Sequence, residues 1–307
     1  MERPERSNRK VLDIFLPGMI NAYGHRSRFP AVSITGPSCA LGCEHCKGYL
    51  LKSMYHIRTP DELLRILNNF EKNGMIGALL SGGCDKNGRM PWKRFLPVLT
   101  NYETGLYLIA HGGMNISSDI AELFKNTPIK QILIDIVGDA ETLKYVYHID
   151  DFSVMENTLK NVYLSDLGVA PHVIIGIHGG KIKGEFSALD MLAEFQKEEV
   201  ILVVLMPDVM NAETPDIKDV IEVFSYARKL FKRVTLGCAR PRGKYRKVLE
   251  TALLENNLID AMALWSYEGI KKAKSLGYRV RFYEGCCSIP LRKEIPILKE
   301  FYGIGIF

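Results

Sequence analysis

Residues 33–48 read SITGPSCALGCEHCKG and contain three cysteines, Cys39, Cys43 and Cys46, within eight positions. The cysteines directly follow a short β-rich run, so they are expected in the loop after the first strand of the fold. Thiolates are soft ligands that suit iron–sulfur clusters or zinc, and three at this spacing can surround one cluster. Because a four-iron cluster has four corners, three ligands leave one iron open to another molecule.

The alternatives at this loop are a zinc site and a cluster that only transfers electrons. A structural zinc ion normally has four Cys or His ligands, and the close fourth candidate, His45, adjoins Cys46 and is poorly placed to share its metal. An electron-transfer cluster normally has four cysteine ligands. The motif therefore favours a cluster with one open iron.

Short β-rich runs alternate with amphipathic helical stretches along most of the chain, which is typical of a parallel sheet covered by helices. Eight such runs predict an α/β fold, a (β/α)8 TIM-type barrel. The first helix has the clearest start, because Thr59 can cap it, Pro60 suits its first turn and Glu62 completes a capping box. The predicted strands are 31–35, 76–80, 105–110, 130–137, 172–177, 200–206, 233–236 and 260–264.

The expected organisation is a single barrel domain with two short extensions. Residues 1–30 are expected to form a helical N-terminal extension below the barrel, residues 31–277 the barrel, and residues 278–307 a C-terminal extension. A ninth strand-like run, Arg279 to Glu284, is expected outside the barrel proper. Helices after the first are predicted at 91–102, 118–125, 155–167, 188–197, 217–231 and 244–255.

Chemically informative residues gather directly after the predicted strands. In a barrel of parallel strands these positions share the C-terminal face, where barrel active sites lie. Glycine pairs there let backbone approach a ligand closely, because no Cβ intervenes. Besides the three cysteines, the residues are Ser81-Gly82-Gly83-Cys84, His111-Gly112-Gly113, Asp135 with Gly138 and Asp139, His178-Gly179-Gly180, Pro207-Asp208, and Cys238 with Arg240.

The CxxxCxxC motif in the loop after the first strand resembles the radical S-adenosylmethionine (SAM) superfamily. The resemblance implies that Cys39, Cys43 and Cys46 hold a [4Fe-4S] cluster, and that the amino and carboxylate groups of SAM chelate its open iron. In that family the residue before the third cysteine is usually aromatic and packs against the nucleotide. His45 occupies this position here, and its imidazole can take that role.

Further SAM contacts follow from the same resemblance. They are implied for the turn Ser81, Gly82 and Gly83 (SAM amino group), for Asp135 (ribose), and for the backbone of Gly176, Ile177 and His178 (adenine). Cys84 departs from the pattern, because an acidic residue is common after the glycine pair.

Four further cysteines, Cys84, Cys238, Cys286 and Cys287, equal the number of ligands that a second [4Fe-4S] cluster needs. Adjacent strand residues point to opposite faces, so Cys286 and Cys287 could share a cluster only if the chain turns after Gly285. Ser288, an arginine or an external thiol could then replace one ligand. Structural or resolving thiols are the alternative, since buried cysteine is a common core residue.

With two clusters the chain resembles the biotin-synthase-like branch, in which the second cluster is dismantled to supply sulfur to carbon radicals. The segments SITGPSCALGCEHCKG, LLSGGCDKNGRMP, GCARPRGKYR and YEGCCSIP, in this order, resemble the archaeal two-component lipoyl synthases. This implies sulfur insertion into an octanoyl chain on a carrier protein domain, a second radical SAM subunit as partner, and an electron donor such as ferredoxin. The extra N-terminal cysteine motif and serine ligand of single-chain lipoyl synthases are not found in this sequence.

Other functions stay open at this level. One alternative is a radical SAM enzyme with another outcome, such as a biotin-synthase-like enzyme, a methylase or a cofactor-maturation enzyme, and a single cluster per chain would favour it. A non-catalytic iron–sulfur or zinc scaffold would bind no SAM. After the seventh strand, Arg240, Arg242 and Lys244 could bind the SAM carboxylate, a cluster sulfide or an acidic carrier domain, or form a solvated basic loop.

Composition narrows the class further. The 307 residues are 47% hydrophobic and 24% charged, which predicts one well-packed domain. The net charge of +5 is spread along the chain, so no nucleic-acid partner is expected. With no apolar run long enough for a signal peptide or membrane span, seven cysteines favour metal chemistry over disulfides. A cytoplasmic enzyme without a membrane partner is expected.

Overall fold

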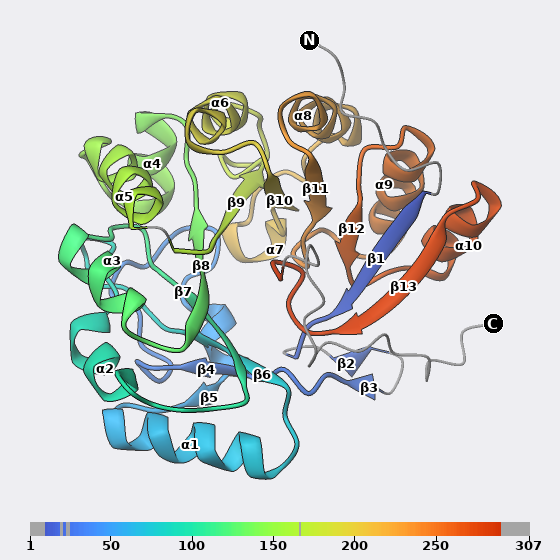
Figure 1. Ribbon diagram of the computed structural model, residues 1–307. Coiled ribbons are helices and arrows are strands. Elements are labelled where there is room, and N and C mark those ends of the chain that lie inside the picture. The colour runs from blue at the N-terminus through green and yellow to red at the C-terminus, as the bar shows by residue number, and fades with distance from the viewer. Residues whose placement is uncertain (1–9, 19–20, 23–24, 166, 290–307) are drawn as a thin grey trace.

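The computed structural model describes residues 10–18, 21–22, 25–165 and 167–289, and at its centre is one parallel sheet of eleven strands. The sheet curls into a partial barrel with most of the helices on its outer side (Figure 1). Its strands are β1 (Val11–Leu16), β4 (Ala31–Ser33), β5 (Tyr55–His56), β6 (Gly77–Ser81), β7 (Tyr107–His111), β8 (Ile129–Asp135), β9 (Val169–Ile175), β10 (Glu199–Val204), β11 (Arg233–Leu236), β12 (Ala261–Ala263) and β13 (Arg279–Glu284).

The strand order is β13-β1-β12-β11-β10-β9-β8-β7-β6-β4-β5. All eight strands that the sequence predicts are present, and they pair in chain order from β4 to β12. Within the described residues the edge strands β5 and β13 do not pair, so the barrel stays open between them. The observed architecture is therefore an open, curled α/β barrel. A separate antiparallel hairpin joins β2 (Asn21–Ala22) and β3 (His25–Arg26).

Strands β1 and β13 correct two expectations. Strand β1 lies between β12 and β13 in parallel register, with Asp13 opposite Ala261 and Leu16 opposite Glu284. A helical N-terminal segment is therefore wrong for Val11–Leu16, and Arg279–Glu284 belongs to the sheet rather than outside it. Five of the six β1 residues are buried, as expected for a strand covered on both faces. Residues 1–9 and 290–307 of the two predicted extensions lie outside the described residues.

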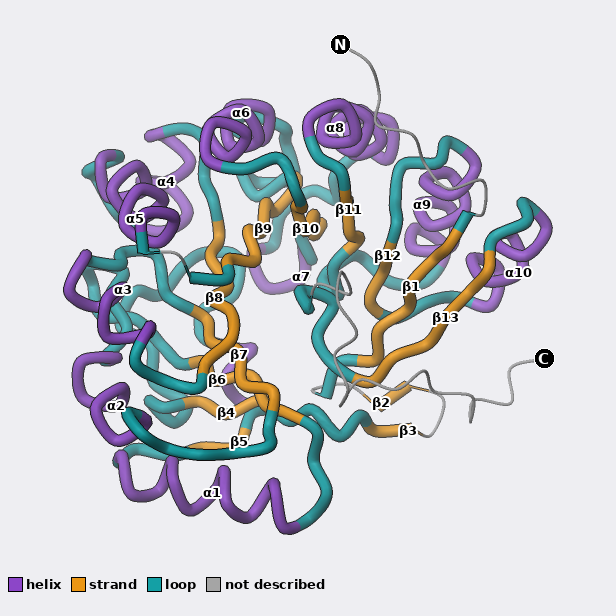
Figure 2. The backbone as a smooth tube through the Cα atoms, viewed as in Figure 1, coloured by secondary structure: helices purple, strands orange, loops and turns teal. Residues whose placement is uncertain are grey.

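Helices follow the strands on the outer side of the sheet (Figure 2). The predicted capping box is confirmed, because Glu62 N donates to Thr59 Oγ1 at 3.3 Å and Thr59 N donates to Glu62 Oε2 at 3.1 Å. The helices α4, α7 and α10 were not predicted. The helices are α1 (Pro60–Lys72), α2 (Trp92–Leu99), α3 (Ser118–Lys125), α4 (Ala140–Tyr147), α5 (Ser153–Leu164), α6 (Glu185–Phe195), α7 (Pro207–Met210), α8 (Ile217–Leu230), α9 (Lys244–Glu255) and α10 (Tyr267–Ser275), with a 3₁₀ helix η1 (Tyr49–Ser53).

The apolar core has two layers. The larger layer fills the space between the sheet and its helices and contains Leu12, Leu108 and Ile132. The smaller layer, made by strand and loop residues such as Phe15, Ile109 and Ile201, faces the inside of the curl. Because this inner layer is apolar, the polar side chains gather at the carboxyl ends of the strands. Among the described residues, no helix is both long and apolar enough to cross a membrane.

Candidate active site

Cys39, Cys43 and Cys46 lie in the loop between β4 and η1, as predicted. The backbone N–H of Cys46 donates to the carbonyl of Cys43 at 3.2 Å, and that of Lys47 donates to the same carbonyl at 2.8 Å. Glu44 N donates to Val146 O of α4 at 2.9 Å, so the loop is tied to the neighbouring helix. These bonds hold the cysteines over the carboxyl end of the sheet.

The thiols of Cys43 and Cys46 share a hydrogen bond, which makes them unequal. This bond, with further help from His45, lowers the pKa of Cys46 to about 4. The same bond, together with burial, raises the pKa of Cys43 far above its ordinary value. One thiolate is therefore available near neutral pH, and thiolates rather than thiols bind metals.

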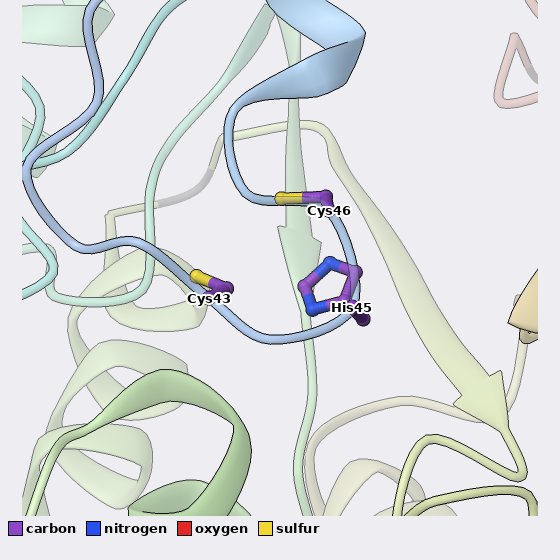
Figure 3. Close-up of side chains that lie close together, drawn as sticks. All are labelled: Cys43, His45 and Cys46. Carbon is purple, nitrogen blue, oxygen red and sulfur yellow. The ribbon is translucent and has the colours of Figure 1, made fainter. Parts of the chain in front are cut away.

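The donor set fits an iron–sulfur cluster. The Sγ atoms of Cys43 and Cys46 and a ring nitrogen of His45 lie within 4.8 Å of one another, while Cys39 lies outside that group (Figure 3). Ligands of a cluster each bind a different iron and stand further apart than ligands of one ion, so a wider spacing of Cys39 suits a cluster. His45 packs on Tyr147 with 5.3 Å between ring centroids. Both His45 Nδ1 and Tyr147 Oη are buried without a partner among the described residues, and so are free to bond a cofactor.

The glycine turn after β6 packs directly on the cysteine loop. A Cβ at Gly83 would lie 2.0 Å from Ser38 O and 2.5 Å from Cys39 Cα, so no larger residue fits. The backbone N–H of Gly83 donates to Thr35 Oγ1 at 2.7 Å. The glycine turn therefore contacts the cysteine loop. The predicted role of Ser81, Gly82 and Gly83 in binding the SAM amino group stays a prediction, and the N–H of Gly83 is already used.

His111 and Asp135 form an ion pair at the ends of β7 and β8, with 3.6 Å between Nε2 and Oδ2. Their side chains keep 29% and 20% of their surface accessible, so they face an open space. Burial would raise the pKa of Asp135, but the hydrogen bond and charge of His111 outweigh it and lower the pKa to about 2. Burial likewise disfavours the charged form of His111, but Asp135 raises its pKa above the ordinary value. The charges of Cys46 and Cys286 also raise the pKa of His111.

Replacing Asp135 by asparagine will lower the pKa of His111, because burial then acts without an opposing carboxylate. In the wild type, the Asp135 contribution to stability is present above its unfolded pKa and is lost as the pH falls through about 2. The His111 contribution is present below its unfolded pKa and is lost as the pH rises through the raised folded value. Histidine NMR titration measures the shift. Asp150→Asn, which removes an exposed partner of Lys144, is the control and should leave His111 unchanged.

The predicted adenine segment has contacts of its own. The N–H of Gly176 donates to Glu185 Oε1 at 2.7 Å, and His178 Nδ1 bonds Thr142 Oγ1 at 3.0 Å. The imidazole of His178 also packs on Tyr145, with 5.1 Å between ring centroids. The His178 side chain is thus held against α4, and adenine contact by this segment stays a prediction.

The remaining cysteines divide between two places. Cys84 lies beside the first loop, where its carbonyl accepts from Cys39 Sγ at 3.8 Å. Cys286 and Cys287 share a hydrogen bond, which lowers the pKa of Cys286 to about 7. Enclosure by protein and the charge of Cys286 raise the pKa of Cys238 to about 11, although solvent reaches Cys238. The structure therefore groups Cys238 with Cys286 and Cys287 and separates them from Cys84, which the sequence could not do.

A turn after Gly285 allows the second group to form. Gly285 has a φ of 130°, and Ile289 N donates to Cys286 O at 3.1 Å, so the chain leaves the extended conformation there. Such a turn is needed for the adjacent residues Cys286 and Cys287 to face one site. Cys286 Sγ lies 2.7 Å from Ser288 Oγ, which adds a hydroxyl to the three thiols.

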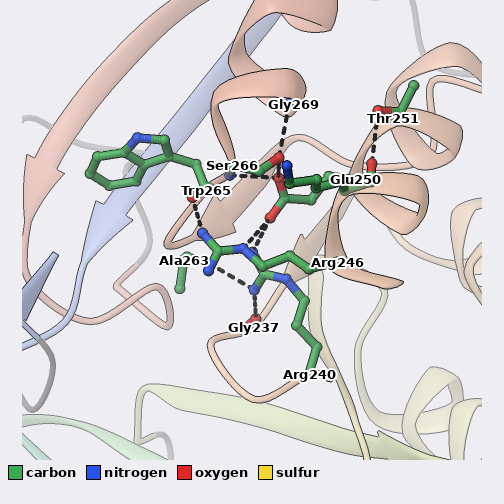
Figure 4. Close-up of polar contacts among 10 residues, drawn as sticks. Gly237, Arg240, Arg246, Glu250, Thr251, Ala263, Trp265, Ser266 and Gly269 are labelled. Atoms are coloured by element: carbon green, nitrogen blue, oxygen red, sulfur yellow. Dashed lines mark hydrogen bonds and ion pairs between the residues drawn. The ribbon is translucent and has the colours of Figure 1, made fainter. Parts of the chain in front are cut away.

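Arg240 is buried, and it anchors the loop that carries Cys238 (Figure 4). Its Nη1 donates to Gly237 O at 2.7 Å and to Ala263 O at 2.9 Å, and its Nη2 donates to Glu250 Oε1 at 2.6 Å. The expectation that Arg240 binds SAM, a cluster or an acidic carrier domain is therefore wrong for this side chain. Arg240 points inward from the segment RPRGKYR because Glu250 offers a buried countercharge, whereas Arg242 and Lys244 are exposed.

Sequence reasoning missed Tyr147 and Glu250, and it noted His111 only as a strand-end residue without a role. His111 had a sequence signal, since it precedes a glycine pair after a predicted strand. Tyr147 ends a helix that was not predicted, and Glu250 resembles any other glutamate of an amphipathic helix. Their roles depend on contacts between distant segments.

Comparison with known proteins supports the fold at low sequence identity. No protein-family model matches the chain, and no curated protein sequence matches it. The structure of HydG, a maturase of the [FeFe]-hydrogenase, superposes with a TM-score of 0.53 and 15% identity, over 87% of this chain and 60% of HydG. Methylornithine synthase (PylB) gives a TM-score of 0.48 and 14% identity, over 83% of this chain and 72% of PylB.

A third similar structure is Streptococcus suis SuiB bound to S-adenosylmethionine, with a TM-score of 0.49 and 11% identity. That match covers 90% of this chain and 57% of SuiB. This chain thus spans less than two thirds of the HydG and SuiB chains. The likeness to HydG shows a shared fold, and in this chain Cys43, His45 and Cys46 form a group that could hold a metal ion.

Proposed function

We propose that the protein is a radical SAM enzyme in which Cys39, Cys43 and Cys46 hold a [4Fe-4S] cluster and SAM occupies the open iron. The observation that carries the proposal is the three-cysteine loop at the carboxyl end of β4, in an open parallel barrel of the radical SAM type. When bound, these groups would supply a carbon radical that removes hydrogen from an unactivated carbon.

The chain's own residues would bind and orient the cofactors. The Cys46 thiolate is ready to bind iron, and Tyr147 Oη and His45 Nδ1 have hydrogen-bonding capacity to spare. His111, whose pKa is raised by Asp135, would donate a hydrogen bond into the mouth of the barrel. The apolar inner layer would keep water from the opposite end of the barrel.

We further propose sulfur insertion as the reaction, with a second cluster held by Cys238, Cys286 and Cys287. The support is the turn at Gly285, which precedes Cys286 and Cys287, and the effect of the charges of both Cys46 and Cys286 on the pKa of His111. Ser288 Oγ is the nearest candidate for a fourth ligand. Lipoyl synthesis on an octanoylated carrier protein domain, with a second radical SAM subunit, is the specific form that we propose.

An electron donor such as ferredoxin is also proposed, since the first cluster must be reduced. The helix η1 begins three residues after Cys46 and exposes 59% of Tyr49 and 43% of Leu50. A donor protein docked there would come close to the cluster loop.

Iron and acid-labile sulfide per chain after anaerobic reconstitution test the proposal. The wild type is expected to hold about eight irons, and the Cys39/Cys43/Cys46→Ala variant about four. The Cys238/Cys286/Cys287→Ala variant should also hold about four and should still cleave SAM to 5′-deoxyadenosine with dithionite. About four irons falling to none in the first variant would sink the second cluster and leave a one-cluster enzyme.

A zinc-binding scaffold is the second candidate, because three ligand atoms of Cys43, His45 and Cys46 lie close enough for one ion. It predicts one zinc per chain, no SAM binding and loss of zinc in His45→Ala. Metal analysis of the protein purified without oxygen separates the two candidates.

A further inference from the structure

A further polar side chain, that of His172, lies inside the barrel beside Asp135. The two residues are register partners on the neighbouring strands β9 and β8. Because side chains alternate along a strand, Asp135 faces the same side as Leu133, and His172 faces the same side as Ala170. Leu133 and Ala170 belong to the inner apolar layer, so Asp135 and His172 both face the inside of the curl, where His172 stays partly exposed.

One hydrogen bond of the His172 imidazole fixes which ring nitrogen carries the proton. Nδ1 lies 3.0 Å from the carbonyl oxygen of Ala170. A carbonyl oxygen only accepts, so Nδ1 is the N–H donor, and in the neutral ring the other nitrogen, Nε2, is an acceptor. Burial lowers the pKa of His172, which favours this neutral form. The ring therefore presents a lone pair at Nε2.

This acceptor has no hydrogen-bond partner within the described part of the chain. The carboxylate of Asp135 pairs with His111, at 3.6 Å, and cannot donate to Nε2 in its charged form. On the other side of His172 the register partner is Ile201, which is apolar. A polar atom enclosed by protein costs free energy unless it is hydrogen-bonded, so Nε2 of His172 points to a ligand that brings a donor.

We propose that His172 binds the substrate, with Nε2 accepting a hydrogen bond from the amide N–H that joins the acyl chain to its lysine. The inference rests on the proposed function, which supplies the acyl-lysine substrate. An octanoyl chain has no hydrogen-bond donor of its own, so the amide N–H is the donor that this substrate brings. Ile174, two residues further along β9 and on the same side, offers the acyl chain an apolar contact.

Two peptides test the hydrogen bond directly. One carries an octanoylated lysine, and in the other an ester oxygen replaces the amide N–H, so that the donor is lost. Calorimetry measures both dissociation constants on the reconstituted protein with SAM and no reductant, where the peptides bind without turnover. Wild type should bind the amide about threefold to tenfold more tightly than the ester. Equal dissociation constants would overturn the inference and leave the proposed function standing.

Substitutions of His172 show whether this preference comes from its ring. His172→Phe keeps a ring but removes the acceptor, so it should bind the two peptides equally. His172→Gln keeps an acceptor oxygen and should retain part of the preference for the amide. His56→Phe, on the edge strand β5, is the control and should behave as wild type. A tenfold loss of SAM affinity in His172→Phe, with the peptide preference intact, would overturn the inference, because the cofactor would then be the ligand of His172.

The position of the ring proton gives a readout that needs neither a variant nor a substrate. Histidine ¹⁵N NMR of the reconstituted, oxidised protein should show the Nδ1–H form of His172. His56 should show the opposite form, since its Nε2 lies 2.9 Å from Leu51 O. An Nε2–H form of His172 would contradict the inference, because Nε2 would then be a donor.

Failure of the proposed function has a different signature in the same calorimetry. If neither peptide binds wild type with its clusters assembled, lipoyl synthesis itself is wrong, and so is the substrate assigned to His172. If both peptides bind with equal affinity, only the role of His172 is wrong.

Discussion

Glu250→Ala will lower the free energy of unfolding by about 3–5 kcal/mol, the loss expected when one partner of a buried ion pair is removed. The Glu250 side chain has no exposed surface, and its carboxylate accepts from Arg240 Nη2 at 2.6 Å and Arg246 Nε at 3.0 Å. It also accepts from the N–H and hydroxyl of Ser266, at 2.8 and 2.6 Å. Without it, the guanidinium of Arg240 stays buried with its countercharge gone.

A neighbouring glutamate on the same helix provides the control. Glu255 pairs with Lys272 at 2.6 Å, but 48% of its side chain is exposed, so Glu255→Ala should cost at most about 1 kcal/mol. Denaturant unfolding of the metal-free proteins, followed by circular dichroism, measures both. A loss below about 1 kcal/mol for Glu250→Ala would show that the network of Figure 4 does not stabilise the fold.

Gly83→Ala is expected to cost about 1–3 kcal/mol and to reduce iron binding by the first loop. The added methyl group would meet Ser38 O at 2.0 Å and Cys39 Cα at 2.5 Å, and both are backbone atoms that cannot rotate away. The cysteine loop must therefore shift, which moves Cys39 relative to Cys43 and Cys46. Iron content and thermal unfolding of the variant measure the two effects.

Gly42→Ala separates this clash from the general cost of replacing a glycine. Gly42 lies in the same loop with a φ of 65°, and a Cβ there meets nothing within 4 Å. The left-handed conformation makes alanine cost about 1–2 kcal/mol, without any contact that displaces Cys39. Equal iron loss in the two variants would show that loop conformation, and not the packing of Gly83, controls the site.

Local signals explain which parts of the fold were predictable. The capping box at Thr59 and Glu62 lies within four residues, and the helices 118–125 and 244–255 were predicted with their observed limits. Strand β1 was missed because its neighbours, β12 and β13, come about 250 residues later in the chain. No local pattern encodes such pairing, since it depends on where the rest of the sheet ends.

The candidate site also has a part that the sequence predicts and a part that it does not. The spacing of Cys39, Cys43 and Cys46 places three thiols in one loop whatever the surrounding structure, because eight residues cannot separate them far. No short spacing in the sequence predicts how the other four cysteines are grouped. Cys84 is 45 residues from Cys39, and only the contact of two strand ends brings it beside the first loop.

The sequence alone thus determined the eight strands β4 and β6 to β12, the first helix cap and the three-cysteine loop, since short-range spacing and hydrophobic periodicity carry that information. The tertiary structure decided the insertion of β1, the inward turn of Arg240 and the partition of the cysteines. The physical reason is that burial and charge pairing depend on which distant segments meet, and a buried arginine and a solvated one look alike in sequence until its partner is known.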